Sequence, residues 1–191
     1  SSARSRSSLS LKAPEISKES IEEISWEEFL QVFKKLWDKG GEGQHVSAIG
    51  RTRSGKTTTM IQMLDERKNV VILLTKLRDP LFPKFKKRGY KPVTDPSEWP
   101  SKEWHPKIML HLPSAGLGRS EGQRQASQIR RVLHRVWDQG DTDLYIDEIA
   151  ELSDLLGLKT ELRAFYKEAG SSNGSLWAGT QRGAWVPREM Y

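Results

Sequence analysis

Residues 50–57 read Gly-Arg-Thr-Arg-Ser-Gly-Lys-Thr and match the phosphate-binding pattern Gly-x-x-x-x-Gly-Lys-[Ser/Thr]. In this pattern the backbone N–H groups of a glycine-rich turn surround a polyphosphate. The Lys56 ammonium would reach the β- and γ-phosphates, and the Thr57 hydroxyl would bind Mg²⁺. The sequence therefore predicts a site for ATP formed by nine consecutive residues: Gly50, Arg51, Thr52, Arg53, Ser54, Gly55, Lys56, Thr57 and Thr58.

The segments on either side of this loop support the prediction. Residues 44–49 predict a buried strand that enters the glycine turn, and residues 57–64 continue without a helix breaker. A strand, a glycine loop and a helix N-terminus together place the positive end of a helix dipole at the phosphates. A chance match in a glycine turn is the alternative, and this order of elements favours the phosphate loop.

A second motif carries two adjacent carboxylates. Residues 143–148 (Asp-Leu-Tyr-Ile-Asp-Glu) predict an apolar strand that ends at Asp147 and Glu148. Asp147 would hold Mg²⁺ together with Thr57, directly or through water. Glu148 would orient and deprotonate an attacking water molecule. The two acids could instead be ordinary first-turn residues of a helix, but the phosphate loop upstream favours catalysis of hydrolysis.

Composition limits the class of protein. The chain has 191 residues, of which 36% are hydrophobic, and it has no cysteine and a net charge of +6. We expect a disordered, basic, Ser-rich tail over residues 1–20 and one domain over residues 21–191. Disulfides and cysteine metal sites are excluded. We see no transmembrane-length apolar run and no signal peptide, so we expect a cytoplasmic protein. The positive charge suits a polyanionic partner, although ordinary surface charge would look the same.

The first predicted element is a helix with an aromatic face. Ser25 and Glu28 have the spacing of a capping box, which predicts that the helix begins here. We expect its apolar face to pack on the core sheet, or alternatively on a neighbouring subunit. This face consists of Trp26, Phe29, Leu30, Phe33 and Trp37.

Strands and helices then alternate along the chain. Apolar runs predict strands over residues 69–75, 108–112 and 175–180, in addition to the strand at 143–148. Helical patterns cover residues 121–139, 152–156 and 158–168, whereas the proline-rich residues 92–106 predict an irregular excursion. This alternation indicates a three-layer α/β fold with a mostly parallel central sheet.

Residues 82–91 interleave basic and aromatic side chains, in the order Phe-Pro-Lys-Phe-Lys-Lys-Arg-Gly-Tyr-Lys. This composition is typical of surfaces that bind a nucleic-acid backbone. A solvated turn has the same composition, and the sequence does not separate the two interpretations.

The last predicted strand ends in a distinctive motif. Gly179-Thr180-Gln181-Arg182, followed by Val186-Pro187, resembles the Ala-Thr-Gln-Arg-Pro segment of the FtsK/HerA superfamily of P-loop motor ATPases. The phosphate loop and the acidic pair agree with that family in order and spacing, so that the resemblance covers residues 44–188. Gly183 departs from it, because the family has proline there.

The resemblance implies a P-loop NTPase fold of the RecA/ASCE type that works on double-stranded DNA as a ring-shaped hexamer. It implies that Gln181 contacts the γ-phosphate as a polar sensor. It also implies DNA translocation or DNA packaging, with a viral portal or capsid component as a further partner, in the host cytoplasm or in the virion.

Two other functions remain open at this stage. One is a nucleotide or small-molecule kinase, and the other is a nucleotide-dependent switch that does not hydrolyse. Glu148 favours hydrolysis, because a switch gains little from a built-in base. An arginine that reaches the γ-phosphate would complete the site; Arg163, between Glu148 and Gln181 in the chain, is our first choice. The candidates are Arg124, Arg131, Arg163, Arg182 and Arg188.

Overall fold

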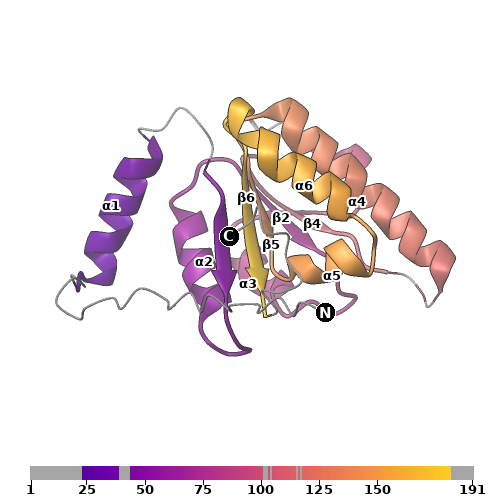
Figure 1. Cartoon of the computed structure of the whole chain (residues 1–191), viewed down its shortest axis with the longest axis horizontal. Helices are drawn as coiled ribbons and strands as arrows, with labels where there is room; N and C mark the ends of the chain where they lie inside the picture. Colours follow the sequence, from indigo (N-terminus) through magenta and orange to yellow (C-terminus); the bar gives the residue numbers. More distant parts are fainter. Residues whose placement is uncertain are drawn as a thin grey trace, which may run out of the picture.

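A parallel sheet forms the centre of the molecule (Figure 1), whose computed structural model describes residues 23–38, 44–100, 103, 105–114, 116 and 118–181. Within these residues the sheet has six strands in the order β1-β6-β5-β2-β4-β3, and every neighbouring pair is parallel. This confirms the predicted parallel sheet. The strands are β1 (Val46–Ile49), β2 (Val70–Leu74), β3 (Lys91–Val93), β4 (Lys107–His111), β5 (Asp143–Ile146) and β6 (Ser175–Thr180).

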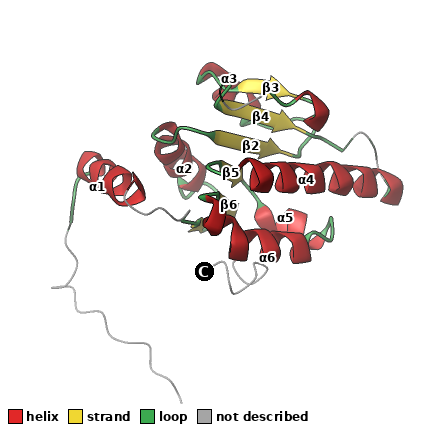
Figure 2. Ribbon diagram, turned by 90° about the horizontal axis from the view of Figure 1, so that it is seen from above, coloured by secondary structure: helices red, strands yellow, loops and turns green. Residues whose placement is uncertain are grey.

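Helices cover both faces of this sheet, as the predicted three-layer fold requires (Figure 2). Alternate strand residues point to opposite faces. Ile72 and Trp177 lie in the apolar core under α1 (Trp26–Asp38), α2 (Lys56–Asp65) and α3 (Phe82–Lys87). Val71 and Leu176 lie in the core under α4 (Arg119–Gln139), α5 (Ile149–Asp154) and α6 (Lys159–Glu168). Two short 3₁₀ helices, η2 (Pro96–Glu98) and η3 (Ala169–Ser172), complete the described elements.

Helix α1 begins at the predicted capping box and packs on the sheet through its aromatic face. The Ser25 N–H donates to Glu28 Oε2 at 2.8 Å, and the Glu28 N–H donates to Ser25 Oγ at 3.2 Å. Phe33 is buried and meets Trp177 of β6 edge to face, with ring centroids 5.8 Å apart. Trp37 lies 5.0 Å from the same indole. The helix therefore packs on its own sheet, as one of the two alternatives predicted.

The prediction of a buried strand before the phosphate loop is wrong. Strand β1 stands at one edge of the described sheet, and its residues alternate between half-buried and exposed. Ile49, at its end, is 47% exposed. The apolar ending of residues 44–49 indicated a strand correctly, but strand order is a property of the whole fold that a local pattern does not contain.

The predicted irregular excursion over residues 92–106 is also partly wrong. Its start belongs to the edge strand β3, which pairs in parallel with β4. Pro92 is tolerated there because an edge strand has one side without ladder partners, where a missing N–H costs nothing. Trp99 follows η2 and is only 4% exposed, because it belongs to the core under α4, and the Arg135 guanidinium lies 5.0 Å from its ring centroid. The segment is therefore anchored to the core at two points.

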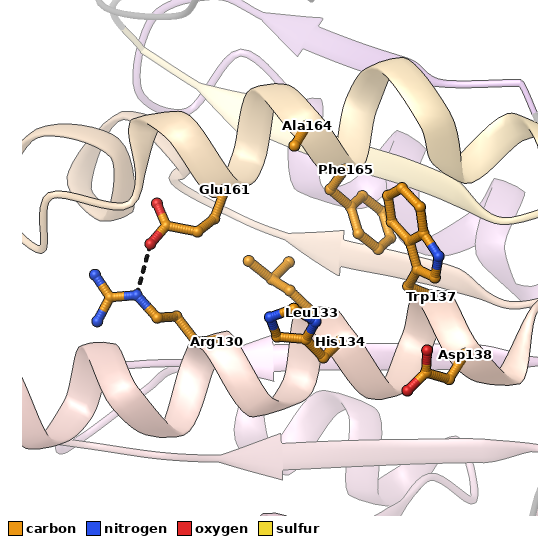
Figure 3. Close-up of a pocket in the computed structure, with 8 residues that line it drawn as sticks. All are labelled: Arg130, Leu133, His134, Trp137, Asp138, Glu161, Ala164 and Phe165. Carbon is orange, nitrogen blue, oxygen red and sulfur yellow. Dashed lines mark hydrogen bonds and ion pairs between the residues drawn. The ribbon is translucent and has the colours of Figure 1, made fainter.

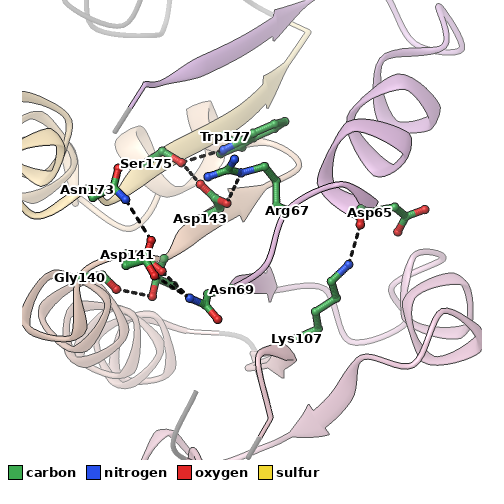
Figure 4. Close-up of polar contacts among 11 residues, drawn as sticks. Asp65, Arg67, Asn69, Lys107, Gly140, Asp141, Asp143, Asn173, Ser175 and Trp177 are labelled. Atoms are coloured by element: carbon green, nitrogen blue, oxygen red, sulfur yellow. Dashed lines mark hydrogen bonds and ion pairs between the residues drawn. The ribbon is translucent and has the colours of Figure 1, made fainter. Parts of the chain in front are cut away.

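A buried ion pair lies at the amino ends of β5 and β6 (Figure 4). The Arg67 Nε–H donates to Asp143 Oδ2 at 2.7 Å, and Asp143 is 2% exposed. The Ser175 hydroxyl also donates to Asp143, and it accepts the Trp177 indole N–H at 2.8 Å. The Arg67 guanidinium in turn lies 4.7 Å from the Trp37 ring. Each polar group in this cluster is satisfied, and the cluster links α1, β5 and β6 at the amino ends of the two strands.

His45 makes an unusual contact just before β1. Its Nδ1 accepts the backbone N–H of Leu176 at 2.9 Å, and its ring stacks on Tyr166 with centroids 4.1 Å apart. Nδ1 must be unprotonated to accept this hydrogen bond. Burial lowers the pKa of His45, which keeps the ring neutral.

We expect the free energy of unfolding to fall as the pH drops below about 6.5, the ordinary pKa of histidine. The unfolded chain takes up this proton first, because the pKa of His45 in the folded chain is lower, and proton uptake by the unfolded state favours unfolding. Urea unfolding of the wild type and of His45→Asn at pH 7.5 and pH 5.5 tests this. The variant keeps an acceptor for Leu176 and should lose less stability at pH 5.5. An equal loss in both proteins would exclude His45 as the cause.

Among the described residues, no helix combines the length and the apolar composition that crossing a bilayer requires.

Candidate nucleotide-binding site

The phosphate loop, the acidic pair and Gln181 meet at the carboxyl ends of the strands, whereas Arg163, also predicted for the site, does not join them. Strands β1, β5 and β6 are parallel neighbours, so their carboxyl ends lie at the same edge. The phosphate loop follows β1, the acidic pair follows β5, and Gln181 follows β6. In open parallel sheets this edge is where ligands bind.

The phosphate loop has the conformation that exposes successive backbone N–H groups. Arg53 and Gly55 have φ angles of 64° and 88°, both in the left-handed region. Gly55 adopts this angle without strain because it has no Cβ. Alternation of left- and right-handed residues makes a concave nest for an anion. Residues 53–58 line a hollow of about 130 Å³ here, at the start of α2.

Lys56 is held inside the loop by the loop's own carbonyl groups. Its Nζ donates to the Gly50 oxygen at 2.8 Å and to the Arg51 oxygen at 2.9 Å. An ammonium has three donors, so at least one is left for another acceptor. Phosphate oxygens are acceptors of the same kind, and the position of Lys56 therefore fits a polyphosphate in this loop.

Two oxygen groups from distant parts of the chain meet beside Lys56. The Thr57 hydroxyl donates to Asp147 Oδ1 at 2.9 Å, across 90 residues of sequence. A hydroxyl and a carboxylate are the hard oxygen ligands that Mg²⁺ prefers, and Mg²⁺ takes its other ligands from phosphates and water. The pair therefore fits Mg²⁺ bound to a nucleotide.

Tyr145, which was not among the predicted site residues, holds the Asp147 carboxylate in place. The Tyr145 hydroxyl donates to Asp147 Oδ1 at 2.6 Å, and the ring is fully buried. Burial, with the Asp147 charge as a second cause, raises the pKa of Tyr145 far above its usual range, so the hydroxyl stays a donor. Residues two apart in a strand share a face. That spacing was the available signal.

Glu148 and Gln181 are joined in a chain of hydrogen bonds that reaches the phosphate loop. Glu148 Oε1 accepts the Thr180 hydroxyl at 2.9 Å, and Oε2 accepts the Gln181 backbone N–H at 3.3 Å. The Gln181 side-chain oxygen accepts the Thr52 hydroxyl at 2.6 Å. Gly179 allows the end of β6 to lie close to the Asp147 backbone, because a Cβ at this position would overlap the Asp147 carbonyl oxygen.

The Gly-x-x-x-x-Gly-Lys-Thr loop joins β1 to α2, the acidic pair follows β5, and β6 lies between β1 and β5. This is the fold of a P-loop NTPase. Among P-loop NTPases, one further component is an arginine at the γ-phosphate.

The arginine candidates within the described residues lie on the far side of the sheet from α2. Arg124 is engaged in its own helix, where it donates to Gln128 at 2.8 Å and pairs with Glu121. Arg131 of α4 and Arg163 of α6 are exposed. Helices α4 and α6 cover the sheet face opposite α2. The remaining candidates, Arg182 and Arg188, lie outside the described residues, as do the predicted tail, Gly183 and the Val186-Pro187 pair.

A second hollow lies between α4 and α6 (Figure 3), with a volume of about 290 Å³. Leu133 and Phe165 give it an apolar lining. At its rim the Arg130 Nε–H donates to Glu161 Oε1 at 2.6 Å. Because it lies on the face opposite α2, this hollow is separate from the phosphate site.

Comparisons with known proteins add a distant similarity in fold. No protein-family model matches the sequence, and no curated protein matches it. Among solved structures, the genome packaging NTPase B204 from Sulfolobus turreted icosahedral virus 2, in complex with AMP, is similar with a TM-score of 0.47 and 17% identity. The match covers 78% of this chain and 70% of that chain. A similarity this distant says nothing about activity, which depends on the site itself.

Proposed function

We propose that this protein is a Mg²⁺-dependent ATPase that uses hydrolysis to move double-stranded DNA, as in translocation or packaging. The observation that carries the hydrolytic part is the contact of Thr57 with Asp147 at 2.9 Å, together with the contact of Thr52 with Gln181 at 2.6 Å. These contacts join the phosphate loop to the ends of β5 and β6. The proposal of DNA as the partner draws on the net charge of +6 and on the resemblance of the Thr180-Gln181 motif to DNA motors.

Each residue has a role that follows from its position. Lys56 places a positive charge in the phosphate loop, where it offsets charge on the β- and γ-phosphates. Thr57 and Asp147 would hold Mg²⁺, which would supply positive charge against the negative charge that develops on the phosphates. The two hydrogen bonds of Glu148 use about half of its acceptor positions, so that the carboxylate can still accept a proton from water. Gln181 links this base to the loop.

A titration of the ATPase rate with duplex DNA separates the three candidate functions. A DNA motor should release inorganic phosphate at a rate that rises with duplex concentration and then saturates. A kinase would instead transfer the phosphoryl group to an acceptor molecule. A switch would bind ATP without turnover in either condition. A rate that duplex DNA does not change would contradict the coupling to DNA.

We also propose that the protein assembles into a ring, as a hexamer, with the nucleotide at the boundary between subunits. The described arginine candidates lie on the sheet face opposite α2, where a neighbouring subunit could receive them more readily than their own site. Arg163, exposed on α6, remains our first choice as the residue donated to the neighbour. Specific activity should then fall on dilution as the ring dissociates. Full activity in a monomer would exclude this arrangement.

A further inference from the structure

The aromatic side chains of residues 82–91 are part of the core. Phe85 and Tyr90 are 0% and 2% exposed, and their rings meet edge to face with centroids 5.0 Å apart. Phe82 is half-buried against His111, at 5.1 Å between centroids. Phe85 and Tyr90 therefore offer no open surface on which unpaired bases could stack, and His111 covers part of the Phe82 ring. The interpretation of this segment as a simple solvated turn is wrong, because Phe82–Lys87 forms α3.

The basic side chains of the same segment point outward. Lys84, Lys86 and Lys87 are exposed, and within the described residues none of them makes an ion pair. Arg88 pairs with Asp65 of α2. Residues 80–94 contain no acidic residue. Burial of the rings has thus separated the charges from the aromatic groups, and what reaches the surface is positive charge.

These charges border a groove between α2 and α3. The groove has a volume of about 450 Å³. Its α2 side presents the hydroxyl of Thr58 and the amide of Gln62, both exposed and both able to donate hydrogen bonds. Its α3 side presents cations. The residues that line it are Thr58, Ile61, Gln62, Lys84, Lys87 and Arg88.

We propose that this groove binds the phosphate backbone of duplex DNA, an inference that rests on the proposed function. Cations with hydroxyl and amide donors are the groups that contact phosphate oxygens in protein–DNA complexes. Binding of single strands depends in addition on stacking of bases on aromatic rings. The buried Phe85 and Tyr90 cannot supply that stacking. The surface therefore fits a duplex, read through its backbone and without sequence preference.

The groove also adjoins the nucleotide site. Thr58 lines both the groove and the hollow of the phosphate loop. It follows Lys56 and Thr57 in the first turn of α2. A phosphate backbone seated in the groove touches the helix that carries both of these nucleotide-binding residues. Duplex DNA bound here therefore alters ATP turnover through α2.

The test compares two double variants with the same change in charge. In K84Q/K87Q two groove lysines are neutralised, and in K35Q/K68Q two exposed lysines outside the groove, one in α1 and one between α2 and β2, are neutralised. Affinity for a duplex of arbitrary sequence is measured from 50 to 300 mM salt, with a single strand of equal length in parallel. Each lost phosphate contact lowers the slope of log affinity against log salt by about 1. We expect a slope about 2 units shallower and affinity roughly 30-fold weaker near 0.15 M salt for K84Q/K87Q.

The control variant should match the wild type in affinity, in salt slope and in the rise of ATPase rate on addition of duplex. If K84Q/K87Q behaves like this control while the wild type binds duplex, the groove assignment is wrong and the proposed function stands. If the wild type binds no duplex at low salt, both are wrong. Tighter binding of the single strand than of the duplex would overturn the assignment to duplex DNA.

Discussion

Glu148→Gln is expected to bind ATP as tightly as the wild type and to lose turnover by a factor of about 10² to 10⁴, the usual contribution of a general base. Glutamine has the same shape as glutamate, and its oxygen can still accept the Thr180 hydroxyl. The charge that holds Mg²⁺ stays on Asp147. What the variant lacks is a basic carboxylate next to the attacking water. Steady-state kcat and nucleotide affinity, measured on the same preparations, check both parts.

Glu151→Gln provides the matched control. Glu151 lies in α5, three residues after Glu148, and its substitution by glutamine changes the charge by the same amount. It should retain wild-type kcat. Turnover by Glu148→Gln at the wild-type rate would show that another group deprotonates the water.

Lys56→Ala is expected to weaken ATP binding by about 100-fold, because it removes charge-assisted hydrogen bonds worth about 1.5 to 3 kcal/mol in a site built around phosphate. Turnover should disappear with it at ordinary ATP concentrations. The substitution also removes the two hydrogen bonds from Nζ to the Gly50 and Arg51 carbonyls. These carbonyls can then bind water, so the loss of stability should be small. Calorimetric titration with a nucleotide and a thermal melt separate the two effects.

Lys68→Ala is the control for Lys56→Ala, since Lys68 is exposed beyond the end of α2 and carries the same charge. Unchanged ATP affinity in Lys56→Ala would mean that the loop does not hold the phosphates.

Local patterns in the sequence predicted the parts of the site that depend on short-range order. The capping box at Ser25, the loop before α2 and the strand that ends at Asp147 each follow from a few adjacent residues. The meeting of Thr57 with Asp147 was also predictable, because two motifs with known roles in one magnesium site must come together. The contact between Thr52 and Gln181, across 129 residues, was not, because no local pattern encodes which side chains face each other at the sheet edge.

The errors have a common physical origin. The edge position of β1 and the pairing of β3 depend on strand order, which arises only when the whole sheet forms. The basic and aromatic side chains of residues 82–91 fitted either a nucleic-acid surface or a solvated turn. The helical spacing of this segment, with Phe82 and Phe85 three residues apart, instead turns the rings inward and the lysines outward. That periodicity was present in the sequence and would have separated the two sets of side chains.

The most direct test of Mg²⁺-dependent hydrolysis at this site is the initial rate of inorganic phosphate release from ATP. It is measured for the wild type in Mg²⁺ and in excess EDTA, with Glu148→Gln as the background. We predict release in Mg²⁺ that EDTA abolishes and that the variant lacks. Binding of ATP by the wild type without phosphate release above the Glu148→Gln background would contradict the proposed ATPase.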